Sequence, residues 1–292
     1  MDHMEEYRRK LKSADGLAAM VKDGWSLCID EGPSLPPAIL EALGRRGEAG
    51  LLRDIRLHGV LDLWPSAAYT CPQAITPVSW FSGKQFKAAV NRGEADIMPC
   101  YYRDMPALYR EYIPVDAFMT VVSPMDENGW FSAGVSGSNS AALFGKAERI
   151  FLEVNEHMPR SLSAPRVHIS QVTALCQHNR PLPVVPPARL DDISRAIGGY
   201  IAQEVPNGAT IQLGIGAIPD AVGLALRDKR DLGIHTELLA DSMMELIECG
   251  AVTNLEKPIH RGKTVATFAS ARSGFTGTYT TTPTWRYYRW TT

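Results

Sequence analysis

Two stretches of this chain resemble each other, and their shared pattern constrains the fold more than any other feature. The first is DGWSLCIDEGPSLPPAILEALGRR (residues 23–46), and the second is NGATIQLGIGAIPDAVGLALRDKR (residues 207–230). Each starts with a polar residue and Gly, continues as a short apolar strand, turns at a Gly, and ends in a helix that closes on Ala-Leu. The repeat of this unit predicts an α/β fold of two similar domains with largely parallel sheets.

The alignment of the two stretches leaves one alternative open. It needs a one-residue shift in the turn, and strand–turn–helix units can look alike by chance. The shared Leu/Ile-Pro-x-Ala sequence, at residues 35–38 and 218–221, favours duplication of one ancestral unit.

Other segments of the predicted first domain have recognisable patterns. Helical spacing of apolar residues predicts a helix over residues 5–21. Apolar runs predict buried strands at 113–124 and 149–155. Between them, DENGWFSAGVSGSNS (residues 126–140) is polar and rich in small residues. Such loops at strand ends often bind ligands in α/β sheets, but composition alone favours a simple connection.

A proline-rich segment, PLPVVPPARL at residues 181–190, marks the boundary between the predicted domains, because proline stops helices and stiffens linkers. The segment at 190–205 has the apolar spacing of an amphipathic helix and is expected to open the second domain. We therefore expect an N-terminal domain at 4–187, a second and incomplete domain at 188–269, and a separate tail at 270–292.

Charge and hydropathy exclude several classes of protein. The net charge is -2, so no basic excess exists to neutralise the phosphates of a nucleic acid. No uninterrupted apolar run reaches the length of a membrane span. The charged N-terminus, MDHMEEYRRKLKS, lacks the apolar core of a secretory signal. A cytoplasmic protein with no nucleic-acid or membrane partner is expected.

The five cysteines are scattered and form no CxxC pair, so the sequence predicts no metal site and no disulfide. Cys28 and Cys249 lie in apolar or helical stretches, where a buried and inert thiol is expected.

The turn after the strand at 210–213 is suited to binding an anion. Gly214 and Gly216 allow the backbone to approach a ligand closely, and Pro219 is well placed in the first turn of the following helix. Free N–H groups at the positive end of a helix suit a phosphate or a developing oxyanion. The rival is a dinucleotide-binding turn, but its GxGxxG pattern requires Gly where Pro219 stands.

A carboxylate, Glu237, follows the next predicted strand at 232–235. If the two strands are neighbours, Glu237 lies beside the GIGAIP turn, at the sheet edge where α/β proteins bind ligands. A structural alternative is that Glu237 only opens a helix, where a carboxylate favours the dipole. His235 could likewise be a core histidine with a backbone partner. The residues alone leave these structural and functional interpretations balanced.

Long, ordered motifs connect these features to a known family. GIGAIPDAV, LGIHTE and VTNLEKPIHRGKTVATFA resemble the acetyl-CoA hydrolase/transferase family, in particular its 4-hydroxybutyrate and butyrate/acetate CoA-transferases. GEADIMPCYYRDMP, PVDAFMTVVSPMDENGWFSAGVS and EVNEHMPR in the first domain support the resemblance, which covers Met4 to Ala269. One departure is Ser242, which stands where the family often has Gly after the Asp of its motif HTE-Met-x-x-Asp-Gly.

The resemblance implies a chemistry and a set of site residues. Glu237, in the HTE motif, is the implied catalytic carboxylate that forms an acyl-glutamyl anhydride and then a glutamyl-CoA thioester. The implied coenzyme A contacts and oxyanion donors are Gly214, Ile215, Gly216, Ala217 and Ile218. Short-chain acyl-CoA and small carboxylic acids are the implied substrates, with no tightly bound cofactor and no metal. Intact members are expected to self-associate.

The tail at 270–292 departs from the family pattern. It contains no Asp, Glu or Lys and has no helical or strand period. Back-translated and read one base earlier, it can give LGSQRLYRYIHDNPDVEVLPVDY, which resembles the phrase that continues the family sequence. We therefore expect a frameshift near the codons for Ala269 and Ser270, an exposed sheet edge at TVATFA, and a weakly stable, inactive product.

Three functional hypotheses follow from the sequence. The first is a CoA-transferase, and the second is an acetyl-CoA hydrolase in which water ends the covalent step. The third is a non-catalytic ligand-binding or interaction protein on the same scaffold. The sequence does not separate transferase from hydrolase, because the difference is water access.

Overall fold

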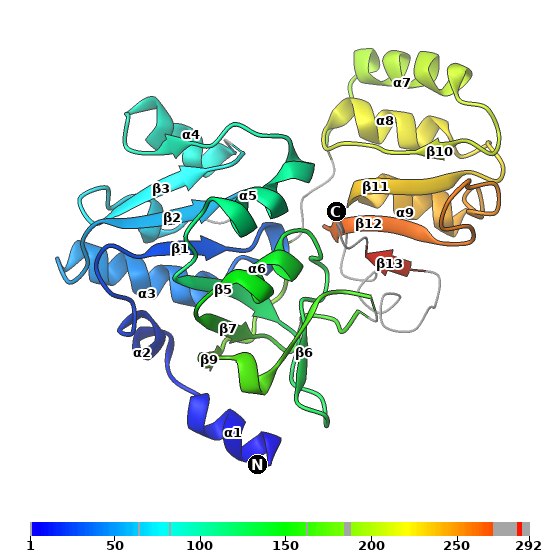
Figure 1. Ribbon diagram of the computed structural model, residues 1–292. Helices are drawn as coiled ribbons and strands as arrows, with labels where there is room; N and C mark the ends of the chain where they lie inside the picture. The colour runs from blue at the N-terminus through cyan, green and yellow to red at the C-terminus, as the bar shows by residue number, and fades with distance from the viewer. Residues whose placement is uncertain are drawn as a thin grey trace. The chain divides into compact units, whose positions relative to one another are not determined.

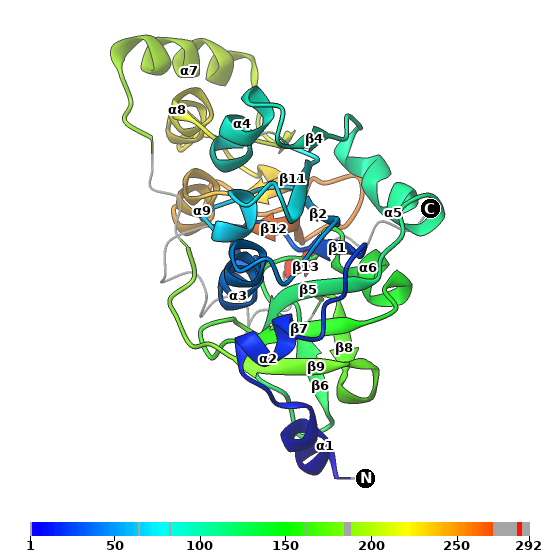
Figure 2. The same cartoon turned by 90° about the vertical axis from the view of Figure 1, so that its left-hand side faces the viewer.

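The computed structural model describes residues 2–270, except Trp64, Ser82, Leu162 and 184–187, together with the backbone of 285–287. The chain forms two compact units. One contains Met1–Arg160 and Pro165–Leu182, and the other contains Pro183–Arg289. Each unit is a parallel sheet with helices packed on it (Figures 1 and 2).

The first unit is built on a seven-stranded sheet in the order β4-β3-β2-β1-β5-β7-β9, in which every neighbouring pair is parallel. Its strands are β1 (Ser26–Ile29), β2 (Ile55–Gly59), β3 (Ile75–Ser79), β4 (Asp96–Ile97), β5 (Ala117–Val122), β7 (Ile150–Val154) and β9 (Ala174–Gln177). A separate antiparallel pair is formed by β6 (Trp130–Ser132) and β8 (Arg166–His168).

Helices connect these strands and cover the sheet. The α-helices are α1 (His3–Lys10), α2 (Ala14–Ala18), α3 (Pro37–Glu48), α4 (Lys84–Asn91), α5 (Met105–Glu111) and α6 (Ser140–Lys146). Short 3₁₀ turns are η1 (Gly32–Ser34), η2 (Ala67–Tyr69), η3 (Tyr102–Asp104) and η4 (Ile169–Gln171).

Both faces of the first sheet are buried, and β1 shows this directly. Leu27 and Ile29 belong to the hydrophobic core that contains residues of α2 and α3, whereas Cys28 belongs to the core that contains residues of α5 and α6. Successive side chains of a strand point to opposite faces, so a strand covered on both sides must be apolar throughout. Each fully buried Leu or Ile contributes roughly 1.5–3 kcal/mol.

The second unit is a four-stranded parallel sheet in the order β10-β11-β12-β13. Its strands are β10 (Thr210–Ile211), β11 (Gly233–Leu239), β12 (Thr264–Ala269) and β13 (Trp285–Tyr287). Its helices are α7 (Asp192–Glu204), α8 (Ala217–Ala225) and α9 (Asp241–Glu248). They pack in a row, α7 on α8 and α8 on α9 (Figure 1). The predicted α/β fold with parallel sheets is confirmed.

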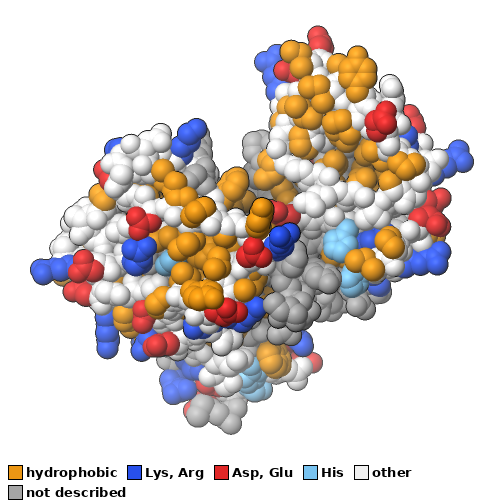
Figure 3. Space-filling model, turned by 45° about the horizontal axis from the view of Figure 1, so that its top comes forward, with side chains coloured by type: hydrophobic (Ala, Val, Ile, Leu, Met, Phe, Trp, Pro, Cys, Tyr) orange, Lys and Arg blue, Asp and Glu red, His pale blue; other side chains and the backbone are white. Residues whose placement is uncertain are grey.

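The helix predicted at 190–205 is α7, and its small side chains face α8. Ser194, Gly198 and Ala202 are its buried residues. A Cβ on Gly198 would lie 2.7 Å from the backbone of Ala221. Larger apolar side chains, including Ile193 and Tyr200, are exposed. Figure 3 shows hydrophobic side chains gathered on the second unit.

The single helix predicted at 5–21 is wrong. The chain forms α1 and α2, separated at Leu11 to Ser13. Lys12 N–H donates to the carbonyl of Leu175 at 2.8 Å, which ties this break to β9. The side chain of Ser13 then caps α2 by accepting from Gly16 N–H. A tertiary contact and a new N-cap therefore override continuous helical spacing.

The segment at 126–140 is more than a polar connection. It contains β6, and its polar side chains from Ser132 to Ser140 are buried. Composition favoured a simple connection, but the hydroxyl groups find hydrogen-bond partners inside the unit, which allows burial.

Three further expectations in the second unit need correction. The strand expected at 210–213 ends at Ile211, and the one expected at 232–235 continues to Leu239 because β12 pairs with it as far as Ala269. The expected exposed edge at TVATFA is wrong, because β13 pairs with β12. The rest of the predicted frameshifted tail lies outside the described residues.

The prediction for the cysteines holds for one of the two thiols. Cys28 is fully buried, and burial raises its pKa far above the ordinary range. Cys249 is exposed, because it follows the last residue of α9 as its C-cap. Across the described part of the chain, no helix is both long and apolar enough to cross a membrane.

Candidate active site

Glu237 lies inside β11, two residues before the strand ends, and not after the strand as predicted. Its neighbours Thr236 and Leu238 are buried, whereas the side chain of Glu237 is exposed. Alternation along the strand therefore sends Glu237 away from the helix-covered face. The alternative that Glu237 opens a helix is excluded, because α9 begins only at Asp241.

Two buried side chains fix the first half of β11. Asn254 accepts from Ile234 N–H at 2.9 Å and donates to Thr264 Oγ1 at 3.0 Å, which joins the starts of β11 and β12. Lys257 Nζ donates to the carbonyls of Ile234 and Lys263, both at 2.7 Å. Burial lowers the pKa of Lys257 to about 8. A charged amine bonded to two backbone carbonyls stabilises this turn next to the strand that carries Glu237.

The backbone of Glu237 is held from β12. Thr267 Oγ1 donates to the carbonyl of Glu237 at 2.7 Å. Partial burial raises the pKa of the Glu237 carboxyl above its usual value of 4.5. A carboxylate that has lost part of its hydration is a better nucleophile than one in bulk water, and here its backbone is fixed as well.

His235 lies on the same face of β11 as Glu237, two residues earlier. It is half-buried, and its ring meets that of His260 edge-on with centroids 6.0 Å apart. Burial, followed by the nearby charges of Lys257 and His260, lowers the pKa of His235. A neutral imidazole is therefore favoured beside the carboxylate. His235 is not the fully buried core histidine of the structural alternative.

The predicted glycine turn leads directly into α8. Gly216 is the N-cap residue with φ 130°, in the region that favours glycine, and no side chain caps the helix. Pro219 lies in the first turn, although α8 begins two residues earlier, at Ala217. Gly214, Ile215 and Ile218 are exposed, and Gly216 and Ala217 are half-buried. The uncapped helix end can donate N–H groups to an anion or an oxyanion.

The turn and the carboxylate follow two neighbouring strands of one sheet. β10 pairs with β11 so that Thr210 is opposite Gly233 and Ile211 is opposite Ile234. The turn with Gly214 comes three residues after Ile211, and Glu237 comes three residues after Ile234. Both therefore follow the paired residues of two neighbouring parallel strands, in the direction of the carboxyl edge of the sheet.

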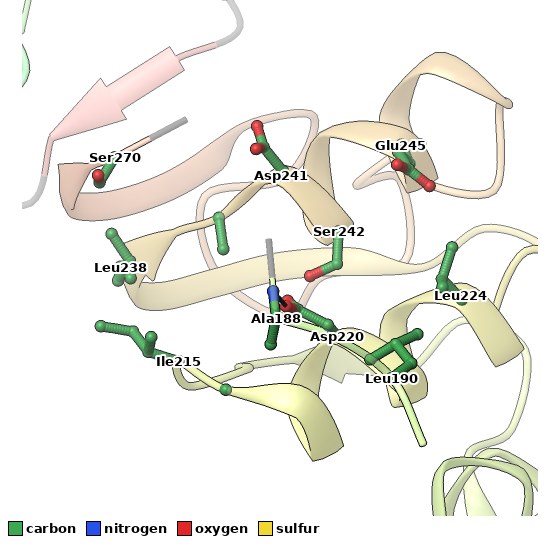
Figure 4. A pocket seen from close by; sticks show the side chains of 12 residues that line it. Ala188, Leu190, Ile215, Asp220, Leu224, Leu238, Asp241, Ser242, Glu245 and Ser270 are labelled. Carbon is green, nitrogen blue, oxygen red and sulfur yellow. Dashed lines mark hydrogen bonds between the residues drawn. The ribbon is translucent and has the colours of Figure 1, made fainter. Parts of the chain in front are cut away.

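A cavity of about 140 Å³ opens beside this turn, between the first turns of α8 and α9 (Figure 4). Apolar residues line most of it, among them Ile215, Leu224 and Leu238. Glu237 is not among the lining residues, because Leu238 points into the cavity and Glu237 projects from the other face of β11. β10 pairs with β11 only as far as Ile211. Beyond that residue β10 does not cover the edge of β11. The cavity lies on one face of β11 and the side chain of Glu237 on the other.

A second polar cluster, in the first unit, was missed by sequence reasoning. Asp30 follows β1 and accepts from the hydroxyls of Ser140, Thr120 and Ser136 at 2.6, 2.9 and 3.2 Å. Burial raises the pKa of Asp30, against the opposing effect of these bonds. The adjacent Glu31 accepts from Tyr102 and Ser138. These hydroxyls fix the segment before α6 at the carboxyl edge of the first sheet.

Comparison with known proteins now gives this arrangement a family. The N-terminal domain of the acetyl-CoA hydrolase/transferase family matches residues 1–186. The chain belongs to this family.

Curated relatives of this acetyl-CoA hydrolase/transferase chain carry CoA-transferase names. A succinyl-CoA:cyclohexane-1-carboxylate CoA transferase from Geobacter metallireducens is 39% identical over 92% of this chain and 61% of the relative. A butyryl-CoA:acetate CoA-transferase from Anaerostipes caccae is 35% identical over 92% and 62%. A 4-hydroxybutyrate coenzyme A transferase from Clostridium kluyveri is 41% identical over 64% and 44%. The chain thus spans between 44% and 62% of the length of these relatives.

Solved structures agree with the family assignment. RipA from Yersinia pestis superposes with a TM-score of 0.92 at 33% identity, covering 98% of this chain and 69% of RipA. A 4-hydroxybutyrate CoA-transferase from Porphyromonas gingivalis has a TM-score of 0.79 at 28% identity, covering 98% of this chain and 68% of that enzyme. The fold of this family member is therefore that of CoA-transferase structures.

Proposed function

We propose that this chain derives from an acyl-CoA:carboxylate CoA-transferase of short-chain acids, with Glu237 as the covalent nucleophile. The observation that carries the proposal is the placement of Glu237. Its exposed carboxylate lies on a strand held at Ile234 and at the carbonyl of Glu237, and the Gly214 turn follows the neighbouring strand β10. A fixed, partly desolvated carboxylate beside free backbone donors is what attack on a thioester requires.

The proposed reaction divides one exchange into balanced steps. A carboxylate oxygen of Glu237 attacks the thioester carbonyl, the C–S bond breaks, and coenzyme A leaves as a thiolate. The thiolate then attacks the glutamyl carbonyl of the resulting anhydride, which releases the first acid as a carboxylate. A second carboxylate reverses both steps, takes up the coenzyme A, and returns Glu237 to its original state.

Backbone donors in the turn would lower the barrier of each step. Every attack produces a tetrahedral oxyanion, and N–H groups between Gly214 and Ile218 are the proposed donors to it. Preorganised donors of this kind are worth about 10²–10³ in rate in other enzymes. Gly216, the N-cap residue of α8, has no side chain that could cap these N–H groups.

A hydrolase is the second candidate, because the side chain of Glu237 is exposed to solvent. Water that reaches the anhydride or the glutamyl thioester would release the acid and free coenzyme A in place of transfer.

An assay of the two products separates these candidates. A protein with the reading frame restored across codons 265–276 is given butyryl-CoA and acetate, and both acetyl-CoA and free coenzyme A are measured. A transferase forms acetyl-CoA in excess of free coenzyme A, and the reverse result favours the hydrolase. Glu237→Gln is expected to lower either rate by roughly a thousandfold or more. The exposed Glu204→Gln is the matched control and is expected to be neutral.

The tail hypothesis makes its own prediction for the 292-residue chain. Residues 270–292 resemble the sequence that continues the family only when their codons are read with a one-base shift. The second domain of this chain would then lack its family-like continuation. We therefore expect this chain to transfer coenzyme A far more slowly than the frame-restored protein. Sequencing the DNA across codons 265–276 tests the shift, and an intact frame without shifted similarity contradicts it.

A further inference from the structure

Two half-buried histidines from distant parts of the chain meet beside Gly129 in the first unit. The rings of His3, at the start of α1, and His168, at the end of β8, lie edge-on with centroids 5.1 Å apart. A Cβ built on Gly129 would lie 2.7 Å from His168 Nε2 and 2.9 Å from His3 Nδ1. The two ring nitrogens therefore converge on one small space that a side chain at residue 129 would fill.

The spacing of the rings is that of two imidazoles bound to one metal ion. A Zn²⁺–N bond is about 2.0–2.1 Å long, so each ring centre lies about 3.2 Å from the ion. At a tetrahedral angle, the two ring centres are then about 5.2 Å apart. The observed 5.1 Å between His3 and His168 matches this separation.

Helix α1, which carries the first histidine, is fixed on the first unit. Tyr7 is buried, and its ring stacks on that of Phe131 with centroids 6.1 Å apart. Lys10 Nζ donates to the carbonyl of Ile169 at 2.7 Å, directly after His168 in the chain. The two imidazoles are therefore preorganised, and a ligand shared between them would order few further groups.

The second nitrogen of His168 has a partner that suits metal binding. His168 Nδ1 lies 2.8 Å from Ser170 Oγ. When Nε2 binds a metal ion, Nδ1 carries the proton and donates it to this oxygen, in place of the longer contact that Ser170 N–H makes to Nδ1 at 3.2 Å. Metal-bound histidines usually donate their other N–H in this way, which fixes the orientation of the ring.

A carboxylate near the two histidines favours a cation. The pKa of the Glu6 carboxyl is lowered, chiefly by its hydrogen bond to Lys10 and least by a charge on His168. Glu6 comes three residues after His3 on α1, so the two side chains lie on the same face of the helix. The ammonium of Lys10 opposes a further positive charge only in part, because Glu6 pairs with it at 2.8 Å.

We propose that His3 Nδ1 and His168 Nε2 form a two-histidine site for a divalent transition-metal ion such as Zn²⁺. In the part of the chain that the structure describes, no group of three or more His, Cys, Asp or Glu side chains is placed to hold a metal ion, so water completes the coordination. Imidazole suits Zn²⁺ and Cu²⁺, whereas Mg²⁺ prefers oxygen ligands. The bound ion joins α1 to β8 and takes no part in the chemistry proposed for Glu237.

The test measures Zn²⁺ binding to the 292-residue chain by calorimetry at neutral pH. His3→Gln and His168→Gln each remove one of the two ligands and are each expected to weaken binding at least tenfold. His157→Gln is the matched control, because His157 is an exposed histidine of the same unit, and it is expected to leave the dissociation constant unchanged. Thermal unfolding without metal shows that each variant keeps its fold.

Trp130 provides a second measurement that locates the ion. Its ring meets that of His168 with centroids 5.1 Å apart. Cu²⁺, which imidazole also binds, is expected to quench the fluorescence of Trp130 from this site. Quenching should therefore be smaller in Trp130→Phe than in the wild type, although both bind Zn²⁺ with similar affinity.

Equal Zn²⁺ affinity in the wild type, His3→Gln and His168→Gln overturns the site, as does a wild type that binds no Zn²⁺ at millimolar concentration. Loss of binding in His3→Gln alone places the ion on the amino-terminal segment without β8 and also overturns it. Quenching by Cu²⁺ that is the same with and without Trp130 overturns the location. Each of these results leaves the proposed function standing, because none of the variants changes a residue of the candidate active site.

Discussion

At the scale of single residues, the proposed chemistry depends on the ionisation of Glu237. The nucleophile must be a carboxylate, and partial burial raises its pKa above 4.5. Activity should therefore fall on the acid side with an apparent pKa above 4.5, when kcat/KM of the frame-restored protein is followed against pH. An acid limb at or below 4.5 would show that the group controlling the reaction is not this carboxyl.

Lys257 makes a prediction about stability. Its pKa is about 8 in the folded chain and 10.5 when unperturbed, so between these values the unfolded state binds more protons. Stability rises with pH wherever that holds, and the gain is absent below the folded pKa. The free energy of unfolding in urea, measured from about pH 7.5 to about pH 9.5, should rise more in the wild type than in Lys257→Met. Parallel pH profiles would contradict this account of the buried amine.

At the scale of elements, α7 provides a matched pair of glycines. A Cβ at Gly198 would meet the backbone of α8 at 2.7 Å, whereas a Cβ at Gly199 would meet nothing within 4 Å. Gly198→Ala should destabilise the second unit by roughly 1–3 kcal/mol through overpacking. Gly199→Ala should stabilise it by up to about 1 kcal/mol, because Ala favours helix. Urea unfolding of the two variants measures both changes, and equal effects would contradict the close packing of α7 on α8.

Sequence patterns predicted the presence of helices and strands better than the residues at which they begin and end. A strand was predicted correctly just before Glu237, but its continuation through Glu237 to Leu239 depends on pairing with β12, which lies beyond the local pattern. The break between α1 and α2 depends on a bond to Leu175, which is more than a hundred residues away in the chain. The buried cluster at Asp30 was missed, because an acidic pair before Gly and Pro has the composition of an exposed turn. Its signal was the run of serines at 132–140.

At the scale of the whole molecule, two parallel sheets follow from the repeated strand–turn–helix unit. Both copies turn at a glycine with positive φ, 53° at Gly32 and 130° at Gly216. Their origin in one duplicated unit stays a prediction. The turn and the carboxylate of the candidate site follow strands that the sequence analysis treated as possible neighbours, and β10 and β11 are indeed paired, with Ile211 opposite Ile234.

The central claim is that Glu237 forms a thioester with coenzyme A. The frame-restored protein is incubated with butyryl-CoA, treated with borohydride, and digested for mass spectrometry. Borohydride reduces a glutamyl thioester to an alcohol and leaves free carboxylates intact, so the account predicts one reduced residue, at Glu237, that is absent without butyryl-CoA and absent in Glu237→Gln. Reduction at another residue, or none in a protein that transfers coenzyme A, would contradict it.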